Sequence, residues 1–526
     1  MCDESEINEY THRSVVNDEP VQYLEQHWRS IRDQSNGAGY PNGLVKFDLL
    51  NLMSDTIVLG DAYIKLRLES HCVVGSQGLV LKNHVANLVH GIFLSINDKT
   101  IENITQGIEE MQQIRNLIEM SYERSLAEGE LIMYAKDEIE DLHNNGVGFG
   151  VTDTELQTAL IATADDAYLK RGALGGSLGQ KAVSKLTGVI SDSDASTRNP
   201  GYNAGYNKRI HFFNRTYTGT LVTYDVNIPL AAISNTFRSM GDEPLSNVHI
   251  KFNLQLNVGS ATAGGTSVPT YNKQHQCATV ECRKVTANGA GGDSSQLLDR
   301  ASKENNFYIP SDTAIELWYR SVRMTAPQIA ANSANPVRTF KQLSFKSYQQ
   351  LGAAYNIAFR FQVVTGLANV DRLWVWLDQS QVEEGVITEY HDTMVTQGFL
   401  PNVKINNLQC FVNNVPFYEV TYDDAEHYSV LHEQFMKNHC KYETRETSLI
   451  SYSDFLSNQR IYCVDLSRMD LEESSSFTLT GTPVYSKFGA VTSPSVMPLR
   501  INCHAEYRSS FSIQAGKKDV DISNIQ

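Results

Sequence analysis

The chain has 526 residues, of which 41% are hydrophobic, 9% aromatic and 20% charged, a composition typical of folded globular proteins. Because a single hydrophobic core stops growing at roughly 250–300 residues, we expect two domains. The 44 basic and 60 acidic residues give a net charge of −16, which excludes a protein that coats nucleic acid over its whole surface, since a polyanion requires a basic surface.

The first 42 residues are polar and end in a cluster of turn residues from Asn36 to Gly43. We interpret residues 1–42 as an N-terminal arm that precedes the first domain. The opening residues MCDESEINEYTHRS are acidic and polar, unlike a secretory signal peptide, and no run of about 18 apolar residues predicts a transmembrane segment. We therefore expect synthesis in the cytoplasm.

The first domain is predicted to cover residues 43–330 and to be mainly β. Its segments Ala62–Glu69 and Val248–Leu256 alternate apolar and polar residues with the two-residue period of a half-buried strand. Further strands are predicted at Leu44–Leu50, Gly91–Ile96, Gly219–Ile228 and Ala314–Arg323.

Helical periodicity is limited to a few places in this domain. The clearest is Thr105–Arg124, where apolar residues such as Ile108 and Ile114 keep to one face. A second helix is predicted at Glu128–Leu142. These helices lead into residues from about 125 to 215, which are rich in loop-forming residues and which we interpret as a large insertion.

The small, polar segment Met324–Val337 is typical of a connection between domains. The second domain is predicted at residues 338–515, with one helix at Asp423–Lys437, and residues 516–526 form a C-terminal tail. Its strands are predicted at Thr339–Tyr348, Asn356–Val364, Arg372–Leu377, Val403–Asn413, Arg460–Leu466, Ser476–Thr480 and Leu499–Ser512. Short strands separated by turn signals indicate a β-sandwich or jelly roll.

The two halves share an order of elements. A strand reaches a turn at Asn97 and is followed by a helix, and the same succession occurs at Asn413. Later strands correspond at Tyr224 and Tyr462. Asn97 and Asn413 are 316 positions apart, whereas Tyr224 and Tyr462 are 238 positions apart. The first half therefore carries 316 − 238 = 78 additional residues between the helix and the later strand.

Motifs for nucleotides and metals are incomplete in this sequence. The glycine-rich run Gly175 to Lys181 lacks the Gly-Lys-Ser/Thr of a phosphate-binding loop, because Gln180 precedes the lysine. His427 and His432 are five positions apart on a predicted helix and do not share a face, and Leu431 to Phe435 does not complete the HExxH motif.

Cys277 and Cys282 have the wrong spacing for a zinc knuckle, and the eight cysteines are spread too thinly for a disulfide framework, so we expect reduced and mostly buried thiols. The paired carboxylates Glu383-Glu384, Asp423-Asp424 and Glu472-Glu473 are interpreted as exposed loop and helix-start charges. We assign no catalytic residue, no cofactor-binding residue and no metal ligand, and we predict that the chain is not an enzyme.

Four segments carry a resemblance to a known family: Asn42–Phe47, Asp61–Leu68, Phe93–Glu102 with its helix, and Leu373–Asp378. With the order of elements over roughly residues 40–515, they resemble the double jelly-roll major capsid proteins of polinton-like viruses and virophages. The resemblance implies an all-β fold with a few inserted helices, built as two tandem antiparallel eight-stranded β-sandwiches.

The same resemblance implies a structural role in the virion. Three chains would form a pseudo-hexameric homotrimer, and these capsomers would tile an icosahedral shell around a double-stranded DNA genome, with penton and minor or cement capsid proteins as further partners. It also implies an exterior or inter-subunit position for the 125–215 insertion. Two alternatives stay open from the residues alone: a carbohydrate-binding or attachment (minor capsid) β-sandwich protein, and, less favoured, a β-sandwich glycosidase.

Overall fold

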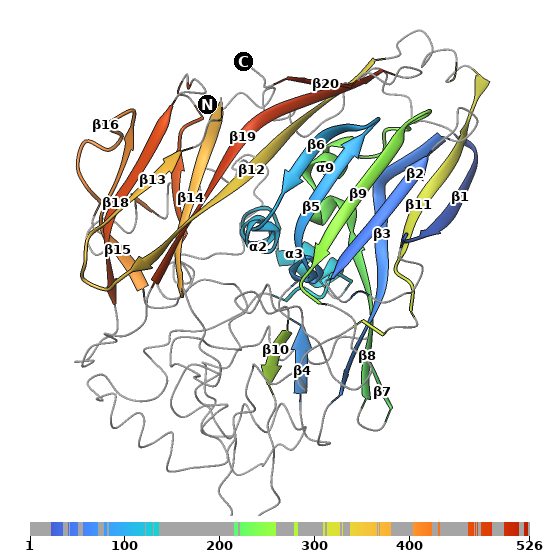
Figure 1. Cartoon of the computed structure of the whole chain (residues 1–526), viewed down its shortest axis with the longest axis horizontal. Coiled ribbons are helices and arrows are strands. Elements are labelled where there is room, and N and C mark those ends of the chain that lie inside the picture. Colours follow the sequence, from blue (N-terminus) through green and yellow to red (C-terminus); the bar gives the residue numbers. More distant parts are fainter. Residues whose placement is uncertain are drawn as a thin grey trace, which may run out of the picture.

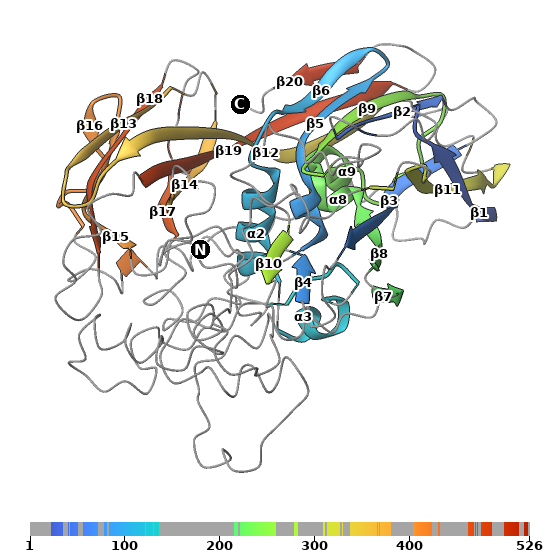
Figure 2. The same ribbon diagram turned by 60° about the horizontal axis from the view of Figure 1, so that its bottom comes forward.

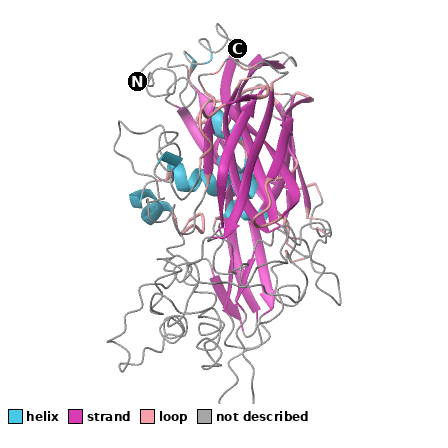
Figure 3. Ribbon diagram, turned by 90° about the vertical axis from the view of Figure 1, so that its left-hand side faces the viewer, coloured by secondary structure: helices cyan, strands magenta, loops and turns pink. Residues whose placement is uncertain are grey.

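This computed structural model describes residues 23–34, 40, 43–50, 56–71, 78–81, 84–120, 122–129, 131–135, 215–218, 221–258, 278–281, 309–310, 313–326, 329, 337–364, 367, 369–379, 403–422, 430–431, 461–467, 469, 471, 475–485, 499–514 and 520–523. Within them the chain forms two β-sandwiches that lie side by side (Figure 1). Seen from the side, their strands run in nearly the same direction (Figure 3).

The first sandwich consists of two antiparallel sheets. One sheet contains, in spatial order, β1 (Tyr23–Arg32), β11 (Glu316–Met324), β3 (Thr56–His71), β8 (Leu221–Pro229) and β7 (Arg215–Thr218). The facing sheet contains β2 (Leu44–Leu50), β9 (His249–Leu256), β5 (Val89–Ile96) and β6 (Lys99–Ile104). Alternate residues of β9 are buried, as a strand with one face on a core requires.

The second sandwich repeats this design. One sheet contains β12 (Val337–Ala353), β19 (Leu499–Gln514), β14 (Val370–Gln379) and β17 (Tyr462–Asp465), and β20 (Val520–Ser523) pairs with the far end of β19. The facing sheet contains β13 (Phe359–Val364), β18 (Ser476–Tyr485), β15 (Val403–Val412) and β16 (Val415–Pro416).

The strand order of the two sandwiches is the same. When the eight principal strands of each sandwich are numbered along the chain, one sheet has the order 1-8-3-6 and the facing sheet 2-7-4-5 in both. In the first sandwich the additional strand β7 extends the first of these sheets. This succession is the jelly-roll arrangement. The predicted fold class, a double jelly roll, is therefore confirmed, and so is the repeat that placed Asn97 opposite Asn413.

Two separate groups of buried apolar side chains form the cores. The first surrounds Phe47, Phe237 and Phe252, and the second surrounds Trp374 and Trp376. Burying each of these aromatic side chains contributes about 1.5–3 kcal/mol to the free energy of unfolding. Each sandwich thus has its own core.

The long strands β12 and β19 extend from the second sandwich across the first (Figure 2). Phe340 and Phe345 of β12 and Phe511 and Ile513 of β19 lie in the first core, although both strands belong to the second sandwich. The two sandwiches therefore share these strands at their junction.

Short helices and a ribbon complete the described fold. The helices are η1 (Val85–Leu88), α2 (Ile108–Glu119), α3 (Tyr122–Glu128), α8 (Leu230–Ile233) and α9 (Asn235–Met240). Strands β4 (Gly78–Leu81) and β10 (Ala278–Glu281) pair as a separate two-stranded ribbon.

Several predictions differ from the structure at the ends of the chain. Within the predicted arm of residues 1–42, Tyr23–Arg32 is strand β1 and pairs with β11, and within the predicted tail of residues 516–526, Val520–Ser523 is strand β20. Strand β1 escaped detection because it is an edge strand with nearly every side chain exposed, so its sequence lacks the alternation that a core imposes.

The helices were predicted too long. The helix predicted at Thr105–Arg124 begins only after Gly107 and is interrupted at Met120, where the backbone is extended, before α3 begins. Of the helix predicted at Glu128–Leu142, Glu128 is helical as the last residue of α3, but residues 131–135 are not, because the chain turns at Leu131–Met133 and Met133 has a φ of 53°.

Other predictions lie largely outside the described residues. Residues 136–214 of the predicted insertion belong there, as does the helix predicted at Asp423–Lys437 except for Val430 and Leu431, which are helical.

Candidate functional site

Helix α2 lies between the two sandwiches and contacts both (Figure 1). Ile108 and Met111 pack in the first core, whereas Ile114, Leu117 and Met120 pack in the second. Because residues three apart share a helix face, the first half of the helix offers an apolar pair to the first sandwich, and the second half, with Met120 after it, offers three apolar side chains to the second. The helix thus fastens the two jelly rolls to each other, and this junction is our candidate functional site.

Five polar side chains of α2 are also buried. These are Glu109, Glu110, Gln113, Arg115 and Asn116. Buried polar and charged groups cost free energy unless they find partners, so their contacts decide which arrangement of the sandwiches is stable.

Two of these contacts reach the first sandwich. The amide Nε2 of Gln113 donates to Oδ1 of Asn87 in η1 at 2.9 Å. Nδ1 of His90 in β5 lies 3.1 Å from Oε1 of Glu109. Burial and the charge of Glu110 raise the pKa of Glu109 to about 7, although the contact with His90 opposes both effects.

The start of α2 lies directly against the second sandwich. Gly107, which precedes the helix, has a φ of +89°, and a side chain there would collide with Oγ of Ser347 in β12 and press on the ring of His504 in β19. The Ser347 hydroxyl contacts the Gln106 carbonyl oxygen at 3.3 Å and Nε2 of His504 at 2.8 Å. Glycine is therefore required here both for its backbone and for the close approach.

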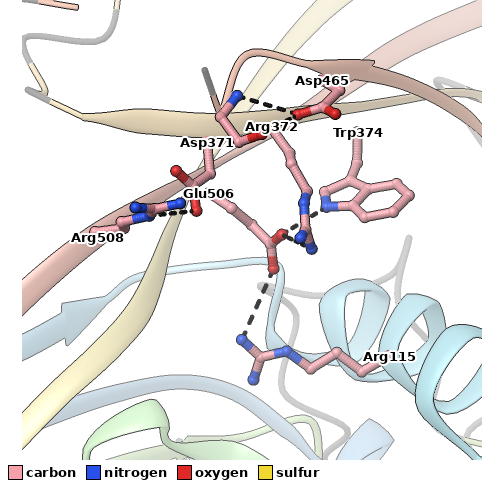
Figure 4. A network of polar contacts seen from close by, with 8 residues as sticks. Arg115, Asp371, Arg372, Trp374, Asp465, Glu506 and Arg508 are labelled. Carbon is pink, nitrogen blue, oxygen red and sulfur yellow. Dashed lines mark hydrogen bonds and ion pairs between the residues drawn. The ribbon is translucent and has the colours of Figure 1, made fainter. Parts of the chain in front are cut away.

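The buried carboxylate of Glu506 in β19 is contacted by polar groups from α2 and from β14 (Figure 4). The indole Nε1 of Trp374 donates to its Oε2 at 2.9 Å, and a guanidinium nitrogen of Arg372 lies 3.8 Å from the same oxygen. Arg115 of α2 approaches its Oε1 at 4.0 Å. Glu506 thus links α2 to strands β14 and β19 through charge-assisted contacts in a setting with little water.

A second ion pair continues this network toward the surface. Nε of Arg508 donates to Oδ2 of Asp371 at 2.8 Å (Figure 4). Burial raises the pKa of Asp371, and the hydrogen bond and charge of Arg508 counteract part of that increase. Asp371 and Arg508 thus extend the group of charged contacts around Glu506.

His504 lies fully enclosed between aromatic rings. Its ring stacks on Phe345 with centroids 5.3 Å apart and meets the edge of Trp376 at 4.6 Å. Burial lowers the pKa of His504 to about 4, so the ring is neutral near neutral pH and serves as a packing element with one hydrogen bond to Ser347.

A second contact between the sandwiches involves α9. The carboxylate of Glu102 accepts from the Ser234 hydroxyl and from the backbone N–H of Asn235 at the start of that helix. The next residue, Thr236, donates from its hydroxyl to Oε1 of Gln342 in β12 at 3.1 Å. These contacts hold β12 against the first sandwich beside α2.

Nearly all residues considered from the sequence as possible sites lie outside the described residues. They are Gly175 to Lys181, Cys277 and Cys282, Glu383 and Glu384, Asp423 and Asp424, His427, His432 to Phe435, and Glu472 and Glu473. Leu431 alone is described, and it is buried in the second core. Cys410, Cys463 and Cys503, which lie in the described part of the chain, are buried.

Within the part of the chain that the structure describes, no three His, Cys, Asp or Glu side chains are grouped as metal ligands. No helix in that part is long and apolar enough to cross a membrane.

Sequence reasoning missed the junction network. Arg115, Arg372 and Glu506 are separated by more than 130 positions at each step, so no local pattern connects them. In β19 the polar residues from Arg500 to Glu506 alternate with apolar ones, which predicts an exposed face. That face is instead covered by the junction, and its polar side chains are buried.

The strand order and the junction together define a double jelly-roll protein. No family model matches the chain, and no curated protein matches it. Similar folds are found among solved structures.

A chain in the cryo-EM structure of the Sputnik virophage is similar over 97% of this chain and 91% of its own length, with a TM-score of 0.53 and 12% sequence identity. The mavirus major capsid protein is similar over 98% of this chain and 94% of its own length, with a TM-score of 0.50 and 10% identity. The resemblance seen in the sequence is therefore confirmed for the fold, which extends over both sandwiches.

Proposed function

We propose that this chain is a major capsid protein that assembles into pseudo-hexameric homotrimers, and that these tile an icosahedral shell around a double-stranded DNA genome in the virion. The observation that carries the proposal is the repeat itself. Two sandwiches of the same strand order are fixed to each other by α2, β12 and β19. Three such chains around a threefold axis would present six similar corners.

The similarity to the mavirus major capsid protein supports the same role. We infer that the chain acts structurally and not as an enzyme, and that its partners are further copies of itself together with penton and minor or cement capsid proteins. A capsid tile must keep a fixed angle between its sandwiches, and the buried contacts of α2 supply that rigidity.

Carbohydrate binding is the second candidate function, because one observation favours it. Trp28, Tyr63 and Trp318 form a row on the outer face of the β1-β11-β3 sheet, with ring centroids 5.7 and 6.3 Å apart. The Trp28 side chain is 47% exposed. Exposed aromatic rings offer apolar faces with polar edges, which suits both sugars and protein interfaces.

Light scattering on the purified chain tests the proposal. A capsomer of three copies has a mass of three times 58.8 kDa, which is 176.4 kDa. A monomer that binds glycans, and loses that binding in a Trp28→Ala variant, would overturn the capsid proposal and establish the second candidate.

A further inference from the structure

The junction contains a cluster of acidic and basic side chains that the capsid role does not explain. Glu109 and Glu110 are neighbours on α2, and their side chains are buried. His90, whose side chain is 19% exposed, approaches Glu109 from β5 at 3.1 Å. Two carboxyl groups and one imidazole are thus enclosed where α2 meets the first sandwich.

The elements packed around α2 supply titratable groups besides His90, Glu109 and Glu110. Strand β19 contributes His504 and Glu506, and η1 is preceded by His84. Helix α8 has the sequence Leu-Ala-Ala-Ile and contributes none.

The other two histidines of this group are uncharged near neutral pH, because burial lowers the pKa of His84 to about 3 and that of His504 to about 4. Arg115 is directed toward Glu506. His90 contacts Glu109 directly, and its pKa is raised.

We propose that His90, Glu109 and Glu110 form a pH-sensitive latch that holds α2 tightly to the first sandwich in mildly acidic solution and loosens it as the pH rises above neutrality. The latch is a property of the single chain, so it does not rest on the proposed capsid role.

The direction follows from the proton balance of the buried groups. The pKa of Glu109 is about 7 in the folded chain, against 4.5 for an ordinary glutamate. Between these values the folded chain holds a proton that the unfolded segment releases, so stability falls as the pH rises through this range. Burial lowers the pKa of His90, but the hydrogen bond and charges of Glu109 and Glu110 raise it by more. Its stabilising charge is therefore also lost as the pH rises.

Helix α2 is the element that responds to the pH, because Glu109 and Glu110 lie in its first turn. When Glu109 is ionised and His90 is neutral, the buried side chains of Glu109 and Glu110 carry like charges in the first half of α2, whose Ile108 and Met111 pack in the first core. Like charges in a poorly hydrated site repel strongly. The contacts of Ile114 and Leu117 with the second core remain, so the first half of the helix loosens before the second.

Hydrogen exchange on the full chain tests the latch. Protection factors, corrected for the intrinsic effect of pH on exchange, are measured for the peptide covering α2 and for β9 as an internal reference. Each pKa unit of displacement corresponds to about a tenfold change in an equilibrium constant. We expect protection of α2 to fall at least about tenfold between pH 6 and pH 8.5, while protection of β9 stays constant.

Two variants test the mechanism independently. Glu109→Gln fixes the neutral form and should keep α2 protected across the range. Glu110→Gln removes the neighbouring charge and should reduce the loss of protection. The exposed Glu128→Gln is the matched control and should behave like the wild type. Unchanged protection of α2 in the wild type, or a fall in Glu109→Gln equal to that of the wild type, would overturn the proposal.

Discussion

Asn97 and Asn413 occupy the same position in the two sandwiches and make the same hydrogen bond. Oδ1 of Asn97 accepts from the backbone N–H of His249 at 2.8 Å, and Oδ1 of Asn413 accepts from that of Ser476, also at 2.8 Å. Both asparagines have a φ of 50° and begin a two-residue hairpin turn. In each sandwich, therefore, an asparagine begins the turn between the fourth and fifth strands.

We expect Asn97→Ala and Asn413→Ala to destabilise the chain by similar amounts, about 2 kcal/mol each. Alanine loses the hydrogen bond, worth about 1 kcal/mol, and is strained at positive φ by about 1 kcal/mol. Calorimetry gives the two values. Glycine at the same positions tolerates the backbone and should recover about half of the loss. A large effect at one position and none at the other would contradict the equivalence of the turns.

Glu506→Ala should cost about 3 kcal/mol, because it removes the carboxylate that faces the buried Arg115 and the partly buried Arg372. Chemical denaturation measures the loss. The control is Glu316→Ala. Glu316 has the same kinds of partner, with Arg32 at 3.8 Å and Trp318 Nε1 at 3.1 Å, but the Arg32 side chain is 69% exposed.

Solvent screens the Glu316 contacts, so we expect its replacement to cost less than about 1 kcal/mol. Equal effects of the two substitutions would show that the buried network does not stabilise the junction.

Gly107→Ala should destabilise the junction more than Gly352→Ala does. Both glycines have a positive φ, +89° and +80°, but an added side chain meets Ser347 and His504 at position 107 and nothing within 4 Å at position 352. The common backbone strain is about 1 kcal/mol, and any further loss at position 107 comes from crowding. Thermal unfolding of both variants checks this, and equal melting temperatures would refute the close approach.

Protonation of the buried histidines should cost stability in acid, in opposition to the stability that Glu109 gains there. An unfolded histidine titrates near 6.5, whereas the pKa of His504 is about 4, so the unfolded state binds more protons and stability is lost as the pH falls from 6.5 toward 4. At pH 5 the expected loss from this residue is about 2 kcal/mol.

His504→Gln retains a polar group toward Ser347 but does not titrate, and calorimetry at pH 7 and pH 5 should show a smaller loss for this variant. The same loss in the variant and in the wild type would assign the acid sensitivity to other groups.

The sequence predicts most of the sandwich strands because a core imposes alternation on them. Strand β9 follows that rule throughout, and the repeated turn at Asn97 and Asn413 reveals the tandem design. Strand β1 could not be found, because nearly all of its side chains are exposed. Its place in the sheet is set by backbone pairing with β11 and by contacts between residues far apart in the sequence, such as that of Trp28 with Tyr63.

The junction could not be predicted either. Glu506, Arg115 and Arg372 are ordinary charged residues in the sequence, and they become partners only because α2 is enclosed between two sandwiches. The helix itself was predicted from the spacing of Ile108 and Ile114, but its two apolar halves serve different cores. Periodicity identifies an apolar face without identifying what covers it.

The most direct test of the capsid proposal is the outline of the purified assembly in electron microscopy. Two equivalent jelly rolls per chain predict a trimer whose projection has six corners, with pairs of corners joined through the α2 junction. Particles with this outline are expected from the wild type. A uniform population of single two-lobed particles, at concentrations where the chain is folded, would contradict the account.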